Sequence, residues 1–377
     1  MQYIFHITKE NKKLPIQEVL SLYELKKCKE LNESHILVDL NDDSIKLYEK
    51  LAYTNDAYKV LFSSAEKSII GKIKKIDWSK VYKKSFAVRI ITIENTIKNN
   101  KSNNDNNNCN DNSSSNKFHN QEQRQNKERE FAKIIYYKLK DSTVDMQAPE
   151  TLIVFFRLKN KYYCCIRIWQ NDKSFMLRKP HLKPELHPTS LNPRLAKGCI
   201  NLIITKNDYE KCFEDNKDDK YKKESGILLL DPFCGVGGIL VEAGLLGINV
   251  IGVDNEQKMI NACLENLNYY GIKDCKLLIN DATKITTKEL GLKAKEITAI
   301  VTDVPYGKNT KKIEHEKLYN AFLKNAAMLT DKMIVMFPDF VYYKKIIRDS
   351  GKWKIKKEFS VYLHKSLSKK IVVLERK

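Results

Sequence analysis

The second half of the chain alternates short apolar runs with amphipathic segments. Apolar runs that predict strands buried on both faces lie at residues 227–231, 249–254, 276–281, 298–303 and 333–337. Helical periodicity follows the first run and recurs at residues 256–270 and 317–329. This order predicts an α/β fold with a doubly wound, largely parallel sheet. Two further runs, at 353–363 and 370–374, predict an antiparallel hairpin at one edge of that sheet.

The first half has the pattern of an α+β protein. Strand-like runs at 3–7 and 35–40 and helical runs at 15–29 and 44–52 predict a small N-terminal subdomain, residues 1–60. A second domain is predicted at 61–170, with strands at 85–91, 151–157 and 162–169 and a helix at 131–139. Four prolines predict an extended connector at 171–195. The α/β domain occupies residues 196–377.

An asparagine-rich stretch interrupts the second domain. From residue 99 to 116, ten of eighteen residues are asparagine, and a charged segment follows at 121–130. Such residues bury too little apolar surface to offset the entropy of ordering. Residues 99–130 are therefore predicted to be a disordered insertion.

The composition of the chain limits its possible binding partners and its cellular compartment. The net charge of +20 and a pI near 9.3 favour a polyanionic partner such as nucleic acid, or reflect a lysine- and asparagine-rich genome. The nine cysteines include no Cys-x-x-Cys spacing, so no metal site and no disulfide framework are expected. No signal peptide and no apolar run of about 18 residues are visible. A soluble, cytoplasmic protein that does not use a membrane is expected.

A glycine-rich turn after the first predicted strand is the first candidate binding element. The sequence Asp231-Pro232-Phe233-Cys234-Gly235-Val236-Gly237-Gly238 leads into a helix, whose N-terminal N–H groups can face a ligand. A dinucleotide fingerprint requires a third glycine at position 240, where this chain has leucine. A nucleotide-like ligand other than NAD or FAD is expected, with a tight turn that binds nothing as the alternative.

Aspartates end four of the predicted strands: Asp231, Asp254, Asp281 and Asp303. In a parallel sheet all four reach the edge where ligands bind. Asp254, followed by Asn255, has the spacing of a carboxylate that accepts both hydroxyls of a ribose. Asp281 and Ala282 lie where an adenine amino group would be recognised.

The sequence Asp303-Val304-Pro305-Tyr306, together with the glycine turn, resembles the S-adenosylmethionine-dependent methyltransferases that act on exocyclic amino nitrogens. The resemblance implies a Rossmann-like class I methyltransferase domain that binds S-adenosylmethionine. It also implies that Asp303, Pro305 and Tyr306 carry catalysis. The cofactor-binding residues that it implies are Asp231, Phe233, Cys234, Gly235, Gly237, Gly238, Asp254, Asn255, Asp281 and Ala282.

These residue types suit methyl transfer to an amine. The lone pair of an exocyclic amine is delocalised into the base, and hydrogen bonds to Asp303 and to a backbone carbonyl at Val304 or Pro305 would localise it. Tyr306 offers a π-face on which an extruded base can stack. Transfer is a single in-line displacement that depends on positioning, so it requires no metal. Methylation at a ring carbon would require a cysteine nucleophile, and none neighbours Pro305.

Four further stretches suggest the substrate. Residues 86–89 and 144–150 resemble the THUMP domain, an RNA-binding module, in which Arg89 would contact phosphate. Residues 187–197 and 361–371 resemble THUMP-containing tRNA guanine-N2 methyltransferases, most closely the archaeal-type enzymes that modify guanosine 10. Lys197 and Lys369 stand where those enzymes often have arginine. The resemblance implies tRNA as partner and guanine N2 as the methylated atom.

Other functions remain open at this point. The same motif would serve a methyltransferase acting on another tRNA guanosine, on DNA adenine N6 or on protein glutamine. A non-catalytic RNA-binding protein with a vestigial cofactor fold is an alternative of a different class. The residues leave open the tRNA position, the number of methyl groups, the oligomeric state and any partner subunit.

Overall fold

The computed structural model describes residues 1–11, 13–40, 46–94, 113–187, 190–215, 226–306, 312–364 and 367–377. The chain forms two compact units. The first combines Met1–Lys9, Lys27–Asp43 and Thr54–Asn171, and the second combines Glu10–Lys26, Ser44–Tyr53 and Asp172–Lys377. The first 60 residues are thus divided between the units, which differs from the separate subdomain predicted there.

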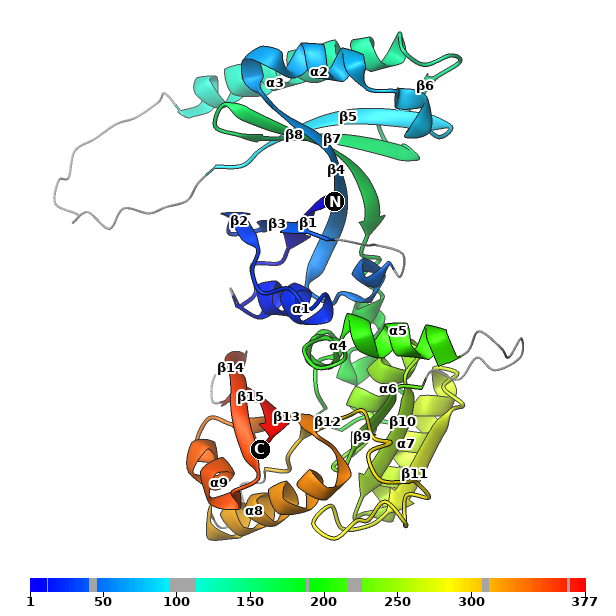
Figure 1. Cartoon of the computed structure of the whole chain (residues 1–377), viewed down its shortest axis with the longest axis vertical. Helices are drawn as coiled ribbons and strands as arrows, with labels where there is room; N and C mark the ends of the chain where they lie inside the picture. The colour runs from blue at the N-terminus through cyan, green and yellow to red at the C-terminus, as the bar shows by residue number, and fades with distance from the viewer. Residues whose placement is uncertain are drawn as a thin grey trace, which may run out of the picture. The chain divides into compact units, whose positions relative to one another are not determined.

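A mixed sheet forms the centre of the first unit (Figure 1). Its strands, in spatial order, are β2 (Lys29–Asn32), β3 (His35–Asp39), β1 (Gln2–Ile7), β4 (Thr54–Ala65), β8 (Lys161–Gln170), β7 (Thr151–Leu158), β5 (Ser85–Thr92) and β6 (Thr143–Val144). The long strand β4 pairs with both β1 and β8, so the N-terminal strands and the strands of the predicted second domain share one sheet. The predicted hairpin at 151–169 is present as β7 and β8.

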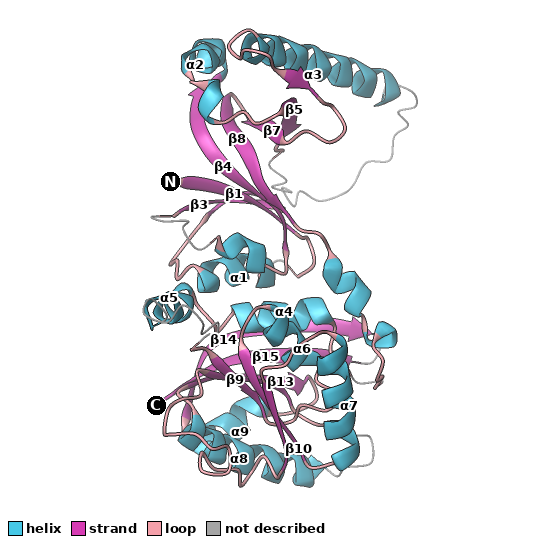
Figure 2. Cartoon of the chain, turned by 90° about the vertical axis from the view of Figure 1, so that its right-hand side faces the viewer, coloured by secondary structure: helices cyan, strands magenta, loops and turns pink. Residues whose placement is uncertain are grey.

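Helices α2 (Ile69–Lys75) and α3 (Ser113–Tyr136) cover one face of β5, β7 and β8 (Figure 2). The predicted disorder of residues 113–130 is wrong, because this segment belongs to α3. Phe131 packs on Phe155 with ring centroids 4.7 Å apart, and Glu128 Oε1 accepts a 2.7 Å hydrogen bond from the Ile90 amide. These partners are distant in sequence and supply the stabilisation that the polar helix lacks. The asparagine-rich residues 99–112 lie outside the described residues.

The sheet of the second unit has the order β11 (Cys275–Ile279), β10 (Asn249–Asp254), β9 (Leu228–Asp231), β12 (Ala299–Asp303), β13 (Lys332–Pro338), β15 (Leu367–Arg376) and β14 (Trp353–His364). The first five strands are parallel, whereas β15 runs antiparallel to both of its neighbours. This confirms the predicted doubly wound sheet with an antiparallel terminal hairpin. The chain order crosses over between β9 and β12, which is where ligands bind in such sheets.

Helices cover both faces of this sheet (Figures 1 and 2). Helices α6 (Gly238–Leu245) and α7 (Gln257–Tyr269) lie on one side, and α8 (Lys312–Leu329) and α9 (Tyr343–Ser350) lie on the other. Helix α9 was not predicted. The connector was predicted to be extended, but it contains two short 3₁₀ helices, Ser174–Arg178 and Pro180–Leu182. The Arg178 guanidinium there donates two hydrogen bonds to buried Glu242 of α6, which the turn makes possible.

A segment from the N-terminal part completes the second unit. Helix α1 (Leu14–Leu22) packs against α4 (Pro193–Asn201), which precedes α5 (Lys206–Asp215). The buried carboxylate of Glu18 accepts hydrogen bonds from the Ala52 amide at 2.6 Å, the Tyr53 amide at 2.9 Å and the Asn201 side chain at 2.7 Å. The helix predicted at 44–52 is a single 3₁₀ turn, Leu47–Lys50, and residues 41–45 lie outside the described residues. Three separate stretches of chain therefore meet at one carboxylate.

Candidate active site

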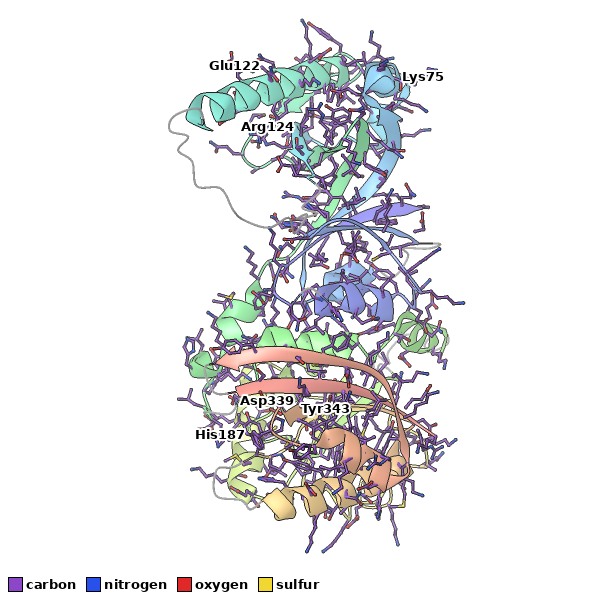
Figure 3. All side chains as sticks on the ribbon, turned by 90° about the vertical axis from the view of Figure 1, so that its left-hand side faces the viewer. Lys75, Glu122, Arg124, His187, Asp339 and Tyr343 are labelled. Atoms are coloured by element: carbon purple, nitrogen blue, oxygen red, sulfur yellow. The ribbon has the colours of Figure 1, made fainter. Side chains whose placement is uncertain are left out.

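A cavity of about 380 Å³ opens at the carboxyl ends of the parallel strands of the second unit. The predicted site residues that line it are Phe233, Gly235, Asp254, Asn255, Asp281, Ala282, Asp303, Pro305 and Tyr306. Lining residues that were not predicted are His187, Pro232, Glu256, Met259, Asn280, Val304 and Leu318. His187 belongs to the connector (Figure 3), so a segment before the α/β domain contributes to the wall.

The glycine turn contributes one residue to the wall of the cavity, and its other residues hold the turn in place. Gly235 lines the cavity, and a Cβ atom there would meet no protein atom within 4 Å. Gly237 has a φ of +80°, and its Cβ would lie 2.6 Å from the Sγ atom of Cys263 on α7. Gly237 is therefore required for the close approach of α7. Cys234, Gly237 and Gly238 support the turn and are absent from the residues that line the cavity.

Two carboxylates face the cavity from consecutive strand ends. Asp254 accepts hydrogen bonds from the amides of Gly235 at 2.9 Å and Glu256 at 3.0 Å, which fixes its orientation. Asp281 accepts from the hydroxyl and the amide of Thr283, and these bonds hold the pKa of Asp281 below its usual range. Each carboxylate oxygen can accept more than one hydrogen bond, so both groups retain capacity for a ligand.

Asp231 differs from the other strand-end aspartates because it is buried beneath the cavity and does not line it. Its carboxylate accepts a 2.6 Å hydrogen bond from the Thr302 hydroxyl and a 3.2 Å bond from the Phe233 amide. It therefore joins β9 to β12 and holds the start of the glycine turn. Three of the four strand-end aspartates, Asp254, Asp281 and Asp303, thus line the cavity, whereas Asp231 does not.

Burial of Asp231 should make stability depend on pH. Desolvation raises the pKa of Asp231 to about 7, although the hydrogen bonds from Thr302 and Phe233 oppose this shift. Because an unfolded chain titrates near pH 4, the folded state binds the proton first as the pH falls. Asp231 therefore stabilises the fold least above pH 7 and more as the pH approaches 4. We expect the wild type to gain thermal stability relative to Asp231→Asn between pH 8 and pH 5, as measured by differential scanning fluorimetry. A difference between the two proteins that is constant across this range would contradict this explanation.

The most constrained part of the cavity surrounds Asp303. Oδ2 of Asp303 is paired with Nζ of Lys369, and Lys369 is fully buried. Oδ1 of Asp303 is buried and has no hydrogen-bond partner among the described residues. The Lys369 ammonium also lies 4.6 Å from the centroid of the Tyr306 ring. Asp303 thus presents one unpartnered acceptor beside an aromatic ring.

The turn after Asp303 is held from helix α8. The Tyr319 hydroxyl donates a 2.6 Å hydrogen bond to the Pro305 carbonyl and lies 3.3 Å from Nδ1 of His315. Val304 is buried and Pro305 is exposed to the cavity. The segment from 303 to 305 is therefore held at the Asp303 side chain and at the Pro305 carbonyl.

Neither a metal-binding cluster nor a membrane-spanning helix occurs among the residues that the structure describes. No group of three or more His, Cys, Asp or Glu side chains there is arranged to hold a metal ion. None of the helices in the described part of the chain is both long and apolar enough to cross a membrane.

Comparison with known proteins identifies the family. The chain is 30% identical over 390 residues to the tRNA (guanine(10)-N2)-dimethyltransferase of Methanothermobacter thermautotrophicus, and the match covers 100% of both chains. The chain belongs to the tRNA (guanine(10)-N2)-dimethyltransferase family. The Pyrococcus abyssi member of this family is 27% identical over 369 residues, covering 95% of this chain and 94% of that one.

Broader family profiles and a solved structure also match this family member. A profile described as "RMKL-like, methyltransferase domain" matches residues 221–369, which include the glycine turn, Asp303 and Lys369. A profile described as "DNA methylase" matches residues 2–265 and ends before Asp303. The crystal structure of TrmN from Thermus thermophilus matches 100% of both chains at 15% identity, with a TM-score of 0.47.

The cavity of this family member fits S-adenosylmethionine, the cofactor of class I methyltransferases. Asp254, oriented by two backbone amides, lines the cavity with a carboxylate, the group that binds ribose hydroxyls in folds of this kind. Phe233, Met259 and Leu318 supply apolar surface for a flat base. Oδ1 of Asp303 has no hydrogen-bond partner among the described residues, so the chain leaves one acceptor unsatisfied here.

Proposed function

We propose that this chain transfers methyl groups from S-adenosylmethionine to the exocyclic N2 of guanosine 10 in tRNA. The observation that carries the proposal is the buried, unpartnered Oδ1 of Asp303 beside Tyr306. A buried acceptor without a donor is costly, and an amino group that donates N–H bonds would satisfy it. The names of the full-length relatives supply guanosine, position 10 and dimethylation.

The residues around Asp303 can activate an amine. S-adenosylmethionine supplies an electrophilic methyl group bound to a sulfonium. Oδ1 of Asp303 would accept one N–H of guanine N2, and a backbone carbonyl would accept the other. The Pro305 carbonyl already accepts from Tyr319, so the Val304 carbonyl is the better candidate for the second bond. Held between two acceptors, the nitrogen directs its lone pair at the methyl carbon.

The reaction balances without another reagent. The bond between sulfur and the methyl carbon breaks as the bond from N2 to that carbon forms, and the positive charge moves from sulfur to nitrogen. The methylated nitrogen, which is strongly acidic while it carries the positive charge, then loses one proton to water or to Oδ1 of Asp303. A second cycle on the remaining N–H gives the dimethylated base.

Tyr306 and the first unit would position the RNA. Tyr306 lines the cavity next to Asp303, where its ring can stack on an extruded guanine. In the first unit, a groove of about 750 Å³ between β5 and α3 is lined by Arg89, Arg124 (Figure 3), Arg129 and Lys133, with the exposed Tyr137. We propose that this groove binds tRNA through phosphate contacts and stacking, and that the protein works in the cytoplasm.

The function is tested with purified full-length protein, methyl-labelled S-adenosylmethionine and transcribed tRNA. We expect label in a transcript with guanosine 10 and at least about a tenfold loss with adenosine 10, because adenine lacks the N2 amine. Nucleoside mass spectrometry then reports N2-methylguanosine and N2,N2-dimethylguanosine. Label retained with adenosine 10 would assign another guanosine. Label in DNA or protein alone would assign another substrate class, and failure to bind the cofactor in calorimetry would favour a non-catalytic protein.

A further inference from the structure

The buried Lys369 is unusual for a lysine, a residue that is seldom fully buried without a partner. Its partners are Oδ2 of Asp303 and the face of the Tyr306 ring. Lys369 lies on β15 opposite Pro338 of β13, and Asp303 lies on β12 opposite Met336. Pro338 and Met336 are two residues apart, so the side chains of Lys369 and Asp303 emerge on the same face of the sheet. The register of the terminal hairpin thus places the cation.

Charge around Asp303 explains why a cation is needed. Desolvation raises the pKa of Asp303, and Lys369 opposes that shift. Other titratable groups near this carboxylate include Asp231 on β9, Cys199 on α4 and Tyr319 on α8, whose hydroxyl lies beside His315. Tyr306 lines the same cavity. Among the described residues, Lys369 is the group that pairs with Asp303. A buried carboxylate without such a partner would take up a proton, and its protonated oxygen would then donate a hydrogen bond and no longer accept one from the amine.

We propose that Lys369 is a positioning residue for methyl transfer: it engages Oδ2 of Asp303 so that Oδ1 faces the acceptor amine. By lying over one face of the Tyr306 ring, it also leaves the opposite face for the base. This inference rests on the proposed function for its catalytic consequence. The pairing itself is a property of the folded chain and can be tested without substrate.

If Asp303 and Lys369 act as a pair, replacing both residues should be less damaging than replacing either one alone. Lys369→Met leaves a buried carboxylate without its cation, and Asp303→Asn leaves a buried ammonium without its anion. The double substitution restores neutrality, and its asparagine oxygen can still accept an N–H bond. Lys370→Met is the matched control, because Lys370 is the next residue of β15 and donates to the Ser360 hydroxyl outside the cavity.

The experiment measures kcat and KM for tRNA between pH 6 and pH 9, and the Tm of each protein without tRNA. We expect Lys369→Met to lower kcat about 100-fold at pH 7, the size of effect seen when a positioned electrostatic group is lost. Its activity should recover partly toward pH 9, because the pKa of Asp303 rises when the cation is removed. Lys369→Arg should restore most of the activity. Lys370→Met should stay within about twofold of wild type, as for a surface substitution.

The double variant distinguishes a joint role of Asp303 and Lys369 from two independent roles. We expect Asp303→Asn with Lys369→Met to exceed either single variant in both kcat and Tm, and to lose the acidic limb of the pH profile. Wild-type kcat and pH profile in Lys369→Met, or single effects that simply multiply, would overturn the proposal. A wild type that methylates no tRNA would instead overturn the proposed function. The Tm comparison would still report on the pair: a double variant no more stable than the single variants would refute it.

Discussion

Asp303→Ala reduces methyl transfer to tRNA by at least about 10²- to 10³-fold, because it removes a preorganised group that acts on the reacting nitrogen. The substitution deletes the unpartnered Oδ1 that we assign to the acceptor amine. Binding of S-adenosylmethionine and of tRNA should change little, since Asp254 and the groove of the first unit are untouched. The measurement is single-turnover transfer of labelled methyl groups, with cofactor affinity taken from calorimetry.

Removing Asp303 leaves the buried Lys369 unpaired, which destabilises the fold. The effect on catalysis must therefore also be measured in a protein in which Lys369 is replaced. Asp303→Ala and Asp303→Asn are therefore also compared in chains that carry Lys369→Met. Both double variants carry no charge at positions 303 and 369. They differ only in whether the side chain at position 303 has an oxygen that can accept a hydrogen bond. We expect the alanine version to fold and bind the cofactor but to stay inactive, and the asparagine version to retain activity. Equal activity of the two would show that Asp303 is not the acceptor.

Asp254→Ala should weaken binding of S-adenosylmethionine by about 100-fold or more. Hydrogen bonds to a charged group contribute about 1.5–3 kcal/mol each, and two ribose hydroxyls would lose them. Because about 1.4 kcal/mol corresponds to a factor of ten, even the lower figure for two bonds gives this change in Kd. The substitution also frees the Gly235 amide, which loosens the glycine turn. Calorimetry with the cofactor alone measures the effect.

The controls for Asp254 separate local from general damage. Asp349→Ala removes an exposed aspartate of the same unit and should leave the Kd unchanged. Asp254→Asn retains one acceptor oxygen and should fall between wild type and alanine. At saturating cofactor, kcat of Asp254→Ala should recover more than kcat/KM does, since the residue acts in binding. A normal Kd in the alanine variant would remove Asp254 from the cofactor site.

The sequence indicated the α/β unit well because its signals are local. Each strand is a short apolar run, and each ends at an aspartate or a turn that the chain itself displays. Most of helix α3, residues 113–130, was missed for the opposite reason, although a helix was predicted from residue 131. Its residues 113–130 are polar, and its stability comes from Phe131, Glu128 and their distant partners in β5 and β7.

The candidate site divides in the same way. Asp254, Asp281 and Asp303 could be placed at one edge from strand ends alone, and they line one cavity. Asp231 could not be distinguished from them, since its burial depends on Thr302 in a neighbouring strand. Lys369 stood in a recognisable motif, but its pairing with Asp303, 66 residues away, requires the hairpin register.

The methyltransferase unit is not one continuous piece of sequence. Glu18 and the amides of Ala52 and Tyr53 come from stretches that precede β4, and Asn201 comes from a stretch that follows β8. No single cut in the gene therefore releases a complete catalytic unit. A fragment starting at residue 172 would lack α1 and leave the Asn201 amide without its carboxylate. The two units must therefore be expressed and engineered as one chain, although each has its own sheet.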